Sequence, residues 1–180
     1  IEAFSAAVQW VIIPFMVAAG TNFALFWHVM TGAPEHLYRD EEFHFFLGVI
    51  AVVAAILAGV LFTDVGLISV EGVGPIAWNV GASVRHAAFQ VASIVTTTGY
   101  ASMDFNAWSN LGKLVLLVGM FIGGSAGSTG GAIKMVRWLV VLKAVKRELF
   151  TPIHPDAVTP IRLSGRPLDE RTRRSIYGCT

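Results

Sequence analysis

The sequence predicts an all-α membrane protein in which one helix is too short to cross a bilayer and another is interrupted within it. Of the 180 residues, 54% are hydrophobic and 14% are charged, and the mean hydropathy is +0.64, which is more apolar than a soluble domain of this size. A short apolar run at residues 84–95 ends in Thr-Thr-Thr-Gly-Tyr. A glycine-rich stretch at residues 123–131 divides a long apolar segment.

The first part of the chain is expected to cross the membrane twice. Residues 1–31 are expected to hold one transmembrane helix, in which Pro14 would bend the helix or remove a backbone hydrogen bond. Asn22 would lie at membrane depth and bond to a neighbouring helix or face a pore. Residues 32–42 form a polar linker, expected on the cytoplasmic side. Residues 43–62 contain a single polar side chain and have the length of one bilayer crossing.

Charge separates the two sides of the membrane. Ten of the 13 Lys and Arg residues lie between Lys134 and Arg174, so residues 151–180 are expected to be cytoplasmic under the positive-inside rule. Residues 63–83 contain no Lys or Arg and are expected outside. So much membrane segment disfavours nucleic acid as the partner of the basic tail. Because the sequence begins inside an apolar run, we expect a fragment of a longer polytopic protein.

The apolar run at residues 84–95 is expected to form a re-entrant helix. Twelve helical residues cover about 18 Å, roughly half the apolar thickness of a bilayer. Residues 96–100 would therefore lie at mid-depth or in an outer vestibule. Irregular backbone is tolerated there only where protein buries it or where it lines water.

A row of backbone carbonyls facing water can replace the hydration shell of a potassium ion. The candidates for such a row are Thr97, Thr98, Gly99 and Tyr100. Gly99 would supply the positive φ that a strand with inward carbonyls needs. On these residues alone, an ordinary turn after a buried helix remains an alternative.

Residues 108–150 would be about 65 Å long as one straight helix, roughly twice what a bilayer needs. The sequence GGSAGSTGG at residues 123–131 is expected to break that helix inside the membrane. The spacing of its glycines also fits close packing of two helices, and the alternative is an unwound loop that lines a cavity. The candidate loop residues are Gly123, Gly124, Ser125, Gly127, Ser128, Thr129, Gly130, Gly131 and Lys134.

Four sequence stretches resemble one transporter superfamily in order and spacing. They are FQVASIVTTTGY, FIGGSAGSTGGAIKMVR, HPDAV and RLSGRPLD. They resemble the Trk/Ktr/HKT superfamily of potassium transporters, in particular the TrkH and KtrB type of membrane subunit, over nearly the whole chain. The resemblance implies four helix–pore-loop–helix repeats around a pseudo-fourfold pore.

By this resemblance, the chain covers the end of repeat two and all of repeat three. Residues 1–31 would end repeat two, and residues 43–150 would form repeat three. Residues 151–180 would be a cytoplasmic linker and the start of the next repeat. Repeat three would consist of a transmembrane helix (43–62), a pore helix (84–95), a filter segment (96–100) and a broken transmembrane helix (108–150) with an intramembrane loop (123–131).

The resemblance implies potassium transport across the cell membrane, with K⁺ as the transported ion and no cofactor in this chain. Residues 97–100 would be one segment of a selectivity filter, and residues 123–131 with Lys134 would form a gating loop. The implied partners are membrane lipid, a second copy in a homodimer and a cytosolic nucleotide-binding subunit like TrkA or KtrA, which would bind ATP, ADP or NAD.

Several alternatives stay open from sequence. Transport could be passive or coupled to H⁺ or Na⁺, and a sodium-permeable member of the same family is also compatible. A scaffold that transports nothing would use its glycines only to pack helices. We expect no enzyme, because no carboxylate pair, Ser/His/Asp set or metal cluster is expected at membrane depth. A membrane enzyme would have to use Asp64 or His86.

Overall fold

The computed structural model describes residues 4–63, 78–150, 162–163 and 166–167. Its helices are α1 (Ala6–Ala19), α2 (Phe23–Met30), α3 (Glu35–Arg39), α4 (Glu41–Thr63), α5 (Val80–Val95), the 3-10 turn η1 (Phe105–Ala107), α6 (Asn110–Met120) and α7 (Met135–Phe150). Two strands of two residues each, β1 (Arg162–Leu163) and β2 (Arg166–Pro167), pair antiparallel. The prediction of an all-α architecture is confirmed but for this short pairing.

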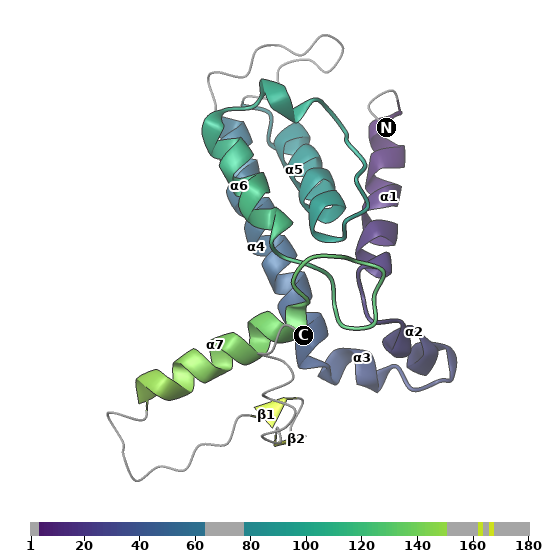
Figure 1. Ribbon diagram of the computed structural model, residues 1–180. Coiled ribbons are helices and arrows are strands. Elements are labelled where there is room, and N and C mark those ends of the chain that lie inside the picture. Colours follow the sequence, from purple (N-terminus) through teal and green to yellow (C-terminus); the bar gives the residue numbers. More distant parts are fainter. Residues whose placement is uncertain (1–3, 64–77, 151–161, 164–165, 168–180) are drawn as a thin grey trace.

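Helix α5 lies at the centre of the bundle. Figure 1 shows it beside α1 on one side and beside α4 and α6 on the other. Leu57 of α4, Val91 of α5 and Leu116 of α6 are all buried in one apolar cluster. Helices α2, α3 and α7 lie at the lower end of the bundle in Figure 1, where α7 points away from the bundle axis.

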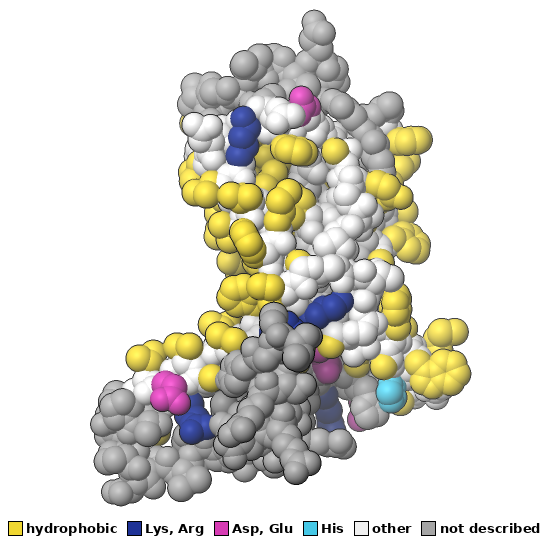
Figure 2. Space-filling view, viewed as in Figure 1, with side chains coloured by type: hydrophobic (Ala, Val, Ile, Leu, Met, Phe, Trp, Pro, Cys, Tyr) yellow, Lys and Arg dark blue, Asp and Glu magenta, His cyan; other side chains and the backbone are white. Residues whose placement is uncertain are grey.

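The outside of the bundle is apolar, while several polar side chains are buried within it. Val52 and Ile56 of α4 and Leu114 of α6 are more than half exposed, and hydrophobic side chains cover much of the face in Figure 2. The buried polar side chains are Gln9, Thr21, Ser83, His86, Gln90, Ser93, Thr96, Ser102 and Ser125. A large exposed apolar surface is typical of contact with lipid or with further protein.

Among the described helices, α4 alone is both long and apolar enough to cross a membrane unaided. It extends from Glu41 to Thr63, slightly beyond the predicted 43–62 at each end. The side chain of Asp40 caps its start, because Asp40 Oδ1 accepts a hydrogen bond from the Phe43 amide at 2.7 Å.

The prediction of one helix across residues 1–31 is wrong. The chain forms α1 and α2, which are bent by 100° relative to each other. Pro14 lies inside α1 without ending it, and the bend is instead at residues 20–22. Asn22 takes extended backbone angles, and its Oδ1 accepts a hydrogen bond from the Ala24 amide at 2.9 Å. Asn22 therefore caps α2. The sequence had predicted that it would bond to a neighbouring helix or face a pore.

The short central helix begins earlier than predicted. It starts at Val80 rather than at residue 84, because Asn79 caps it by accepting a hydrogen bond from the Ala82 amide at 3.1 Å. Its 16 residues cover about 24 Å, which is still less than the ~30 Å of a bilayer core.

The long segment at residues 108–150 is broken. Helix α6 ends at Met120 and α7 begins at Met135, so glycines spaced by four do not lie on one continuous helix. The alternative in which they only pack helices is therefore wrong. The two ends of the loop lie side by side. Ile122 and Ile133 form a parallel bridge there, and the Gly123 amide donates to the Ile133 carbonyl at 3.0 Å.

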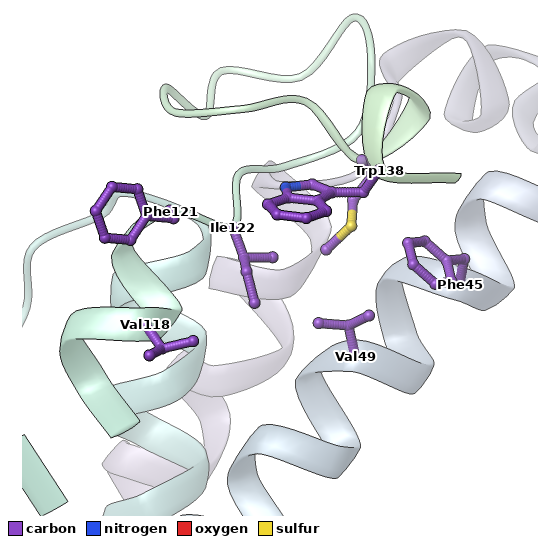
Figure 3. A pocket seen from close by; sticks show the side chains of 7 residues that line it. Phe45, Val49, Val118, Phe121, Ile122 and Trp138 are labelled. Atoms are coloured by element: carbon purple, nitrogen blue, oxygen red, sulfur yellow. The ribbon is translucent and has the colours of Figure 1, made fainter. Parts of the chain in front are cut away.

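An apolar cavity of about 400 Å³ lies beside the two ends of this loop (Figure 3). Phe45 and Val49 of α4 line one side. The remaining lining residues come from α6, its C-terminal end and α7; they are Val118, Phe121, Ile122, Met135 and Trp138. The cavity lies at the corner where the chain turns away from the direction of α6 into α7.

Candidate functional site

The candidate filter segment, residues 96–100, follows the end of α5 and is not helical. The Thr98 amide donates to the Ser93 carbonyl at 2.9 Å, and the Thr97 amide donates to the Ile94 carbonyl at 3.0 Å. This pair of bonds is a Schellman closure, which usually has glycine at the position that Thr97 occupies. Thr97 has φ 57°, a left-handed conformation that costs a β-branched residue on the order of 1–3 kcal/mol.

Gly99 has φ 79°, in agreement with the conformation predicted for it. Thr97 and Gly99 are exposed, and Thr98 is partly exposed. Within the described part of the chain, the carbonyl oxygens of Thr97, Thr98 and Gly99 accept no hydrogen bond. The backbone therefore presents consecutive free acceptors beside the C-terminus of α5, which carries partial negative charge.

Ser93 holds the filter segment against α5. Its carbonyl accepts hydrogen bonds from the Thr98 amide at 2.9 Å and from the Gly99 amide at 3.4 Å. Its hydroxyl donates to the Tyr100 carbonyl at 2.6 Å. One buried serine thus fixes three consecutive residues of the segment, a role that was not predicted from the sequence.

Two more polar side chains of α5 hold the chain that follows the filter segment. His86 is buried, and its Nδ1 lies 3.0 Å from the Ser102 hydroxyl. Gln90 Nε2 donates to the Met103 carbonyl at 3.3 Å. Together with Ser93 these residues lie on one face of α5, because their spacing of four and three residues follows the helical repeat.

The glycine-rich loop, residues 123–131, is held by the junction between α1 and α2. The Ser125 amide donates to the Gly20 carbonyl at 2.9 Å, and the Thr129 hydroxyl donates to the Ala19 carbonyl at 3.1 Å. The Phe23 amide also donates to the Gly127 carbonyl at 3.4 Å.

The backbone of the loop approaches that junction closely. A Cβ atom on Gly124 would lie 2.8 Å from the Gly20 carbonyl oxygen and 2.6 Å from the Ser128 hydroxyl. A larger residue would therefore push the loop away from α1 or displace the side chain of Ser128.

Internal contacts also shape the loop. The Ser128 hydroxyl donates to the Ser125 carbonyl at 2.7 Å. The ammonium group of Lys134 donates to the carbonyls of Ser128 and Gly130. The positive charge of Lys134 thus lies directly against the loop and offsets part of the negative charge on these carbonyl oxygens.

The filter segment and the loop meet at Thr97. The Gly131 amide donates to the Thr97 hydroxyl at 3.0 Å. The two stretches are separate motifs in the sequence, and the structure joins them by a direct hydrogen bond across 34 positions of the chain.

The remaining candidate residues fall in different surroundings. Tyr100 is half exposed and borders a cavity of about 310 Å³ with Phe15 and Met16 of α1. His86, one of the two residues named for a membrane enzyme, contacts the Ser102 hydroxyl. Asp64, the other such residue, lies outside the described residues, as does most of the predicted cytoplasmic linker at 151–180.

Comparison with known proteins gives one consistent result. The family model TrkH, described as a cation transport protein, matches residues 1–180. The Trk system potassium uptake protein TrkH of Escherichia coli K12 is 34% identical over 179 residues, covering 97% of this chain and 34% of that protein. The Trk system potassium uptake protein TrkG of the same strain is 30% identical over 164 residues, covering 91% of this chain and 32% of that protein.

A solved structure is also similar. The crystal structure of the potassium transporter TrkH from Vibrio parahaemolyticus superposes with a TM-score of 0.83 at 28% sequence identity, covering 98% of this chain and 36% of that chain. The chain spans about a third of the length of the curated relatives it matches.

Proposed function

Because the chain belongs to the TrkH family of cation transport proteins, we propose that it contributes one selectivity-filter segment and one gating loop to a potassium transporter. The family consists of transporters rather than enzymes. The two curated relatives described above, TrkH and TrkG of Escherichia coli K12, are both named potassium uptake proteins. The other filter segments of the pore would come from further parts of the parent protein.

The filter segment would bind the ion through its main chain. Of the four predicted residues, Thr97, Thr98 and Gly99 have carbonyls that replace water around a potassium ion. The carbonyl of Tyr100, the fourth, instead accepts a hydrogen bond from the Ser93 hydroxyl. The exposure of the first three residues and the lack of other partners for their carbonyls in the described residues support this role. The three bonds to Ser93 keep the oxygens in place, so that the ion does not have to order them when it enters.

The glycine-rich loop would obstruct the path below the filter. The observation that carries this part of the proposal is the hydrogen bond from the Gly131 amide to the Thr97 hydroxyl at 3.0 Å. An ion that leaves the carbonyls of the filter segment would meet the loop next. Conduction therefore requires the loop to move aside and to break this bond.

The orientation and partners follow from the same proposal. The filter side faces outside, and residues 151–180 face the cytoplasm, because ten of the 13 Lys and Arg residues lie between Lys134 and Arg174. The parent protein works as a homodimer in lipid, and a cytosolic nucleotide-binding subunit like TrkA or KtrA moves the gate.

The substitution Gly99→Val in the intact parent protein tests the filter. Valine at φ 79° is strained, so the carbonyls on either side should turn and potassium selectivity should be lost. The measurement is K⁺ and Na⁺ uptake in cells without other potassium uptake systems. Potassium uptake and selectivity equal to wild type would refute the filter assignment.

Gly48→Val is the matched control. Gly48 lies in α4, where an added Cβ atom would meet no other atom within 4 Å, and its φ is not positive. The control should transport potassium as wild type does, and its expression level shows whether a valine in a membrane helix by itself impairs the protein.

A further inference from the structure

Glu42 contacts the tip of the glycine-rich loop from a distant part of the chain. It lies in the first turn of α4, and its Oε1 accepts a hydrogen bond from the Ala126 amide at 2.6 Å. The two residues are 84 positions apart. Glu42 is partly buried, so its carboxylate exchanges some of its contact with water for this bond.

This bond differs in kind from the other contacts that hold the loop to the rest of the chain. The contacts with Gly20, Ala19, Phe23 and Thr97 join neutral groups. Among the contacts described for the loop, Glu42 provides the single carboxyl acceptor from outside it. Hydrogen bonds to a carboxylate are about twice as strong as bonds between neutral groups.

The same turn of α4 also holds the start and the middle of α7. The carboxylate of Glu42 also lies near the backbone amide of Val136 at the N-terminus of α7, where negative charge is favourable. The neighbouring Glu41 forms an ion pair with Lys143, two turns further along α7. The loop tip and α7 therefore share one anchor, although residues 127–134 separate them in the sequence.

We propose that Glu42 is a positioning residue of the gate, which holds the tip of the glycine-rich loop at Ala126 and couples the loop to α7. This inference rests on the proposed function of the loop. A shift of α7 away from α4 moves Val136 away from the carboxylate of Glu42. The hydrogen bond between this carboxylate and the Ala126 amide is then weakened. Movement of α7 thus releases the loop without any direct contact between a regulator and the pore.

The test is the potassium flux of the purified intact parent protein in liposomes without a regulatory subunit. Glu42→Ala should raise this ungated flux by about tenfold, the effect of losing a hydrogen bond to a charged group. Ala126→Pro removes the donor of the same bond and should raise the flux similarly. The double variant should show no larger effect than either single variant, because both changes remove one contact.

Glu42→Gln is the matched control, and Glu41→Ala tests the other contact between α4 and α7. Glutamine keeps an oxygen that can accept from the Ala126 amide, so Glu42→Gln should restore much of the wild-type closure. Glu41→Ala makes the same change of charge one residue away and loses the pair with Lys143 instead; its flux should change by less than about threefold.

The outcomes separate this inference from the proposed function. Wild-type flux in Glu42→Ala, or additive effects in the double variant, would overturn the role of Glu42 even if Gly99→Val still abolishes selectivity. Reduced flux in Glu42→Ala with a lowered thermal stability would also overturn it, because it would identify a residue that only supports the fold. If the wild-type parent conducts no potassium, the proposed function itself fails.

Discussion

The filter segment and the glycine-rich loop are both irregular backbone next to a helix end, but they are held in different ways. The filter segment is fixed by bonds from its own pore helix, chiefly from Ser93, which lies within seven residues of everything it holds. The loop is held by groups far away in the sequence, including Glu42 and the junction at Ala19–Gly20. Local bonds fix a geometry independently of the surroundings, whereas distant anchors make the position of a loop depend on the elements that carry them.

This difference explains how one chain can hold a rigid element beside a movable one. The carbonyls of the filter segment keep their spacing as long as α5 remains folded. The loop keeps its position only while α1, α4 and the filter segment all stay where they are. A small shift of one of these elements is therefore sufficient to change the loop, and it leaves the filter segment intact.

Deletion of residues 123–131 in the intact parent should have the largest effect, because it removes the movable element and leaves the filter segment. Because Ile122 and Ile133 already form a bridge, the chain can close across the gap without moving α6 and α7 apart. We expect the ungated potassium flux in liposomes to rise by about tenfold or more, because the closed state loses its obstruction. The ratio of K⁺ to Na⁺ flux should stay near the wild-type value.

Two results of the deletion would show that the loop and the filter segment do not have these separate roles. Unchanged or lower flux at normal expression would mean that the loop does not close the path. A lost K⁺ preference would mean that the filter segment depends on the loop for its geometry, contrary to the local bonding described above.

Ser93→Ala is expected to have a moderate effect on the filter alone. It removes the 2.6 Å bond from the hydroxyl to the Tyr100 carbonyl and leaves the backbone bonds of Ser93 in place. One hydrogen bond of about 1 kcal/mol corresponds to a roughly fivefold loss in K⁺ over Na⁺ selectivity. Flux ratios measured in liposomes give this value directly.

Ser109→Ala makes the same chemical change away from the filter. Ser109 caps α6 by accepting from the Gly112 amide at 3.3 Å, so its loss should lower thermal stability slightly without changing selectivity. Equal loss of selectivity in both variants would assign the effect of Ser93 to general destabilisation.

Asn22→Ala should have the smallest effect. The variant loses the cap of α2 and about 1 kcal/mol of stability. Because Asn22 Oδ1 also lies close to Gly127, we expect a rise in ungated flux of less than about twofold. Asn79→Ala removes the equivalent cap of α5 and should lower thermal stability similarly with no rise in flux. A rise in both variants would show that the flux reports helix stability and not the position of the loop.

Features that depend on nearby residues could be predicted from the sequence. Composition and length correctly indicated a full-length helix in α4, a short α5 and a break before α7. The positive φ of Gly99 followed from its place in the motif. The bend at Gly20–Asn22 was missed, because proline is the stronger local signal and Pro14 drew the expected kink six residues too early.

The contacts that hold the gate could not be predicted in the same way. The bond between Glu42 and Ala126 and the bond between Thr97 and Gly131 join residues 84 and 34 positions apart. Neither residue type nor local spacing marks such a pair, since acids in a first helical turn are common for reasons of helix electrostatics alone. The left-handed Thr97 was missed for a related reason, because threonine is not a residue that favours this conformation.

Diffraction from crystals of the intact parent protein grown with Rb⁺ or Tl⁺ would show whether the filter segment binds the ion through its main chain. Both ions substitute for potassium and are located by their anomalous signal. We expect an ion in coordination contact with the carbonyl oxygens of Thr97, Thr98 and Gly99. An ion found elsewhere along the path, with these carbonyls turned away from it, would show that the segment is not part of a selectivity filter.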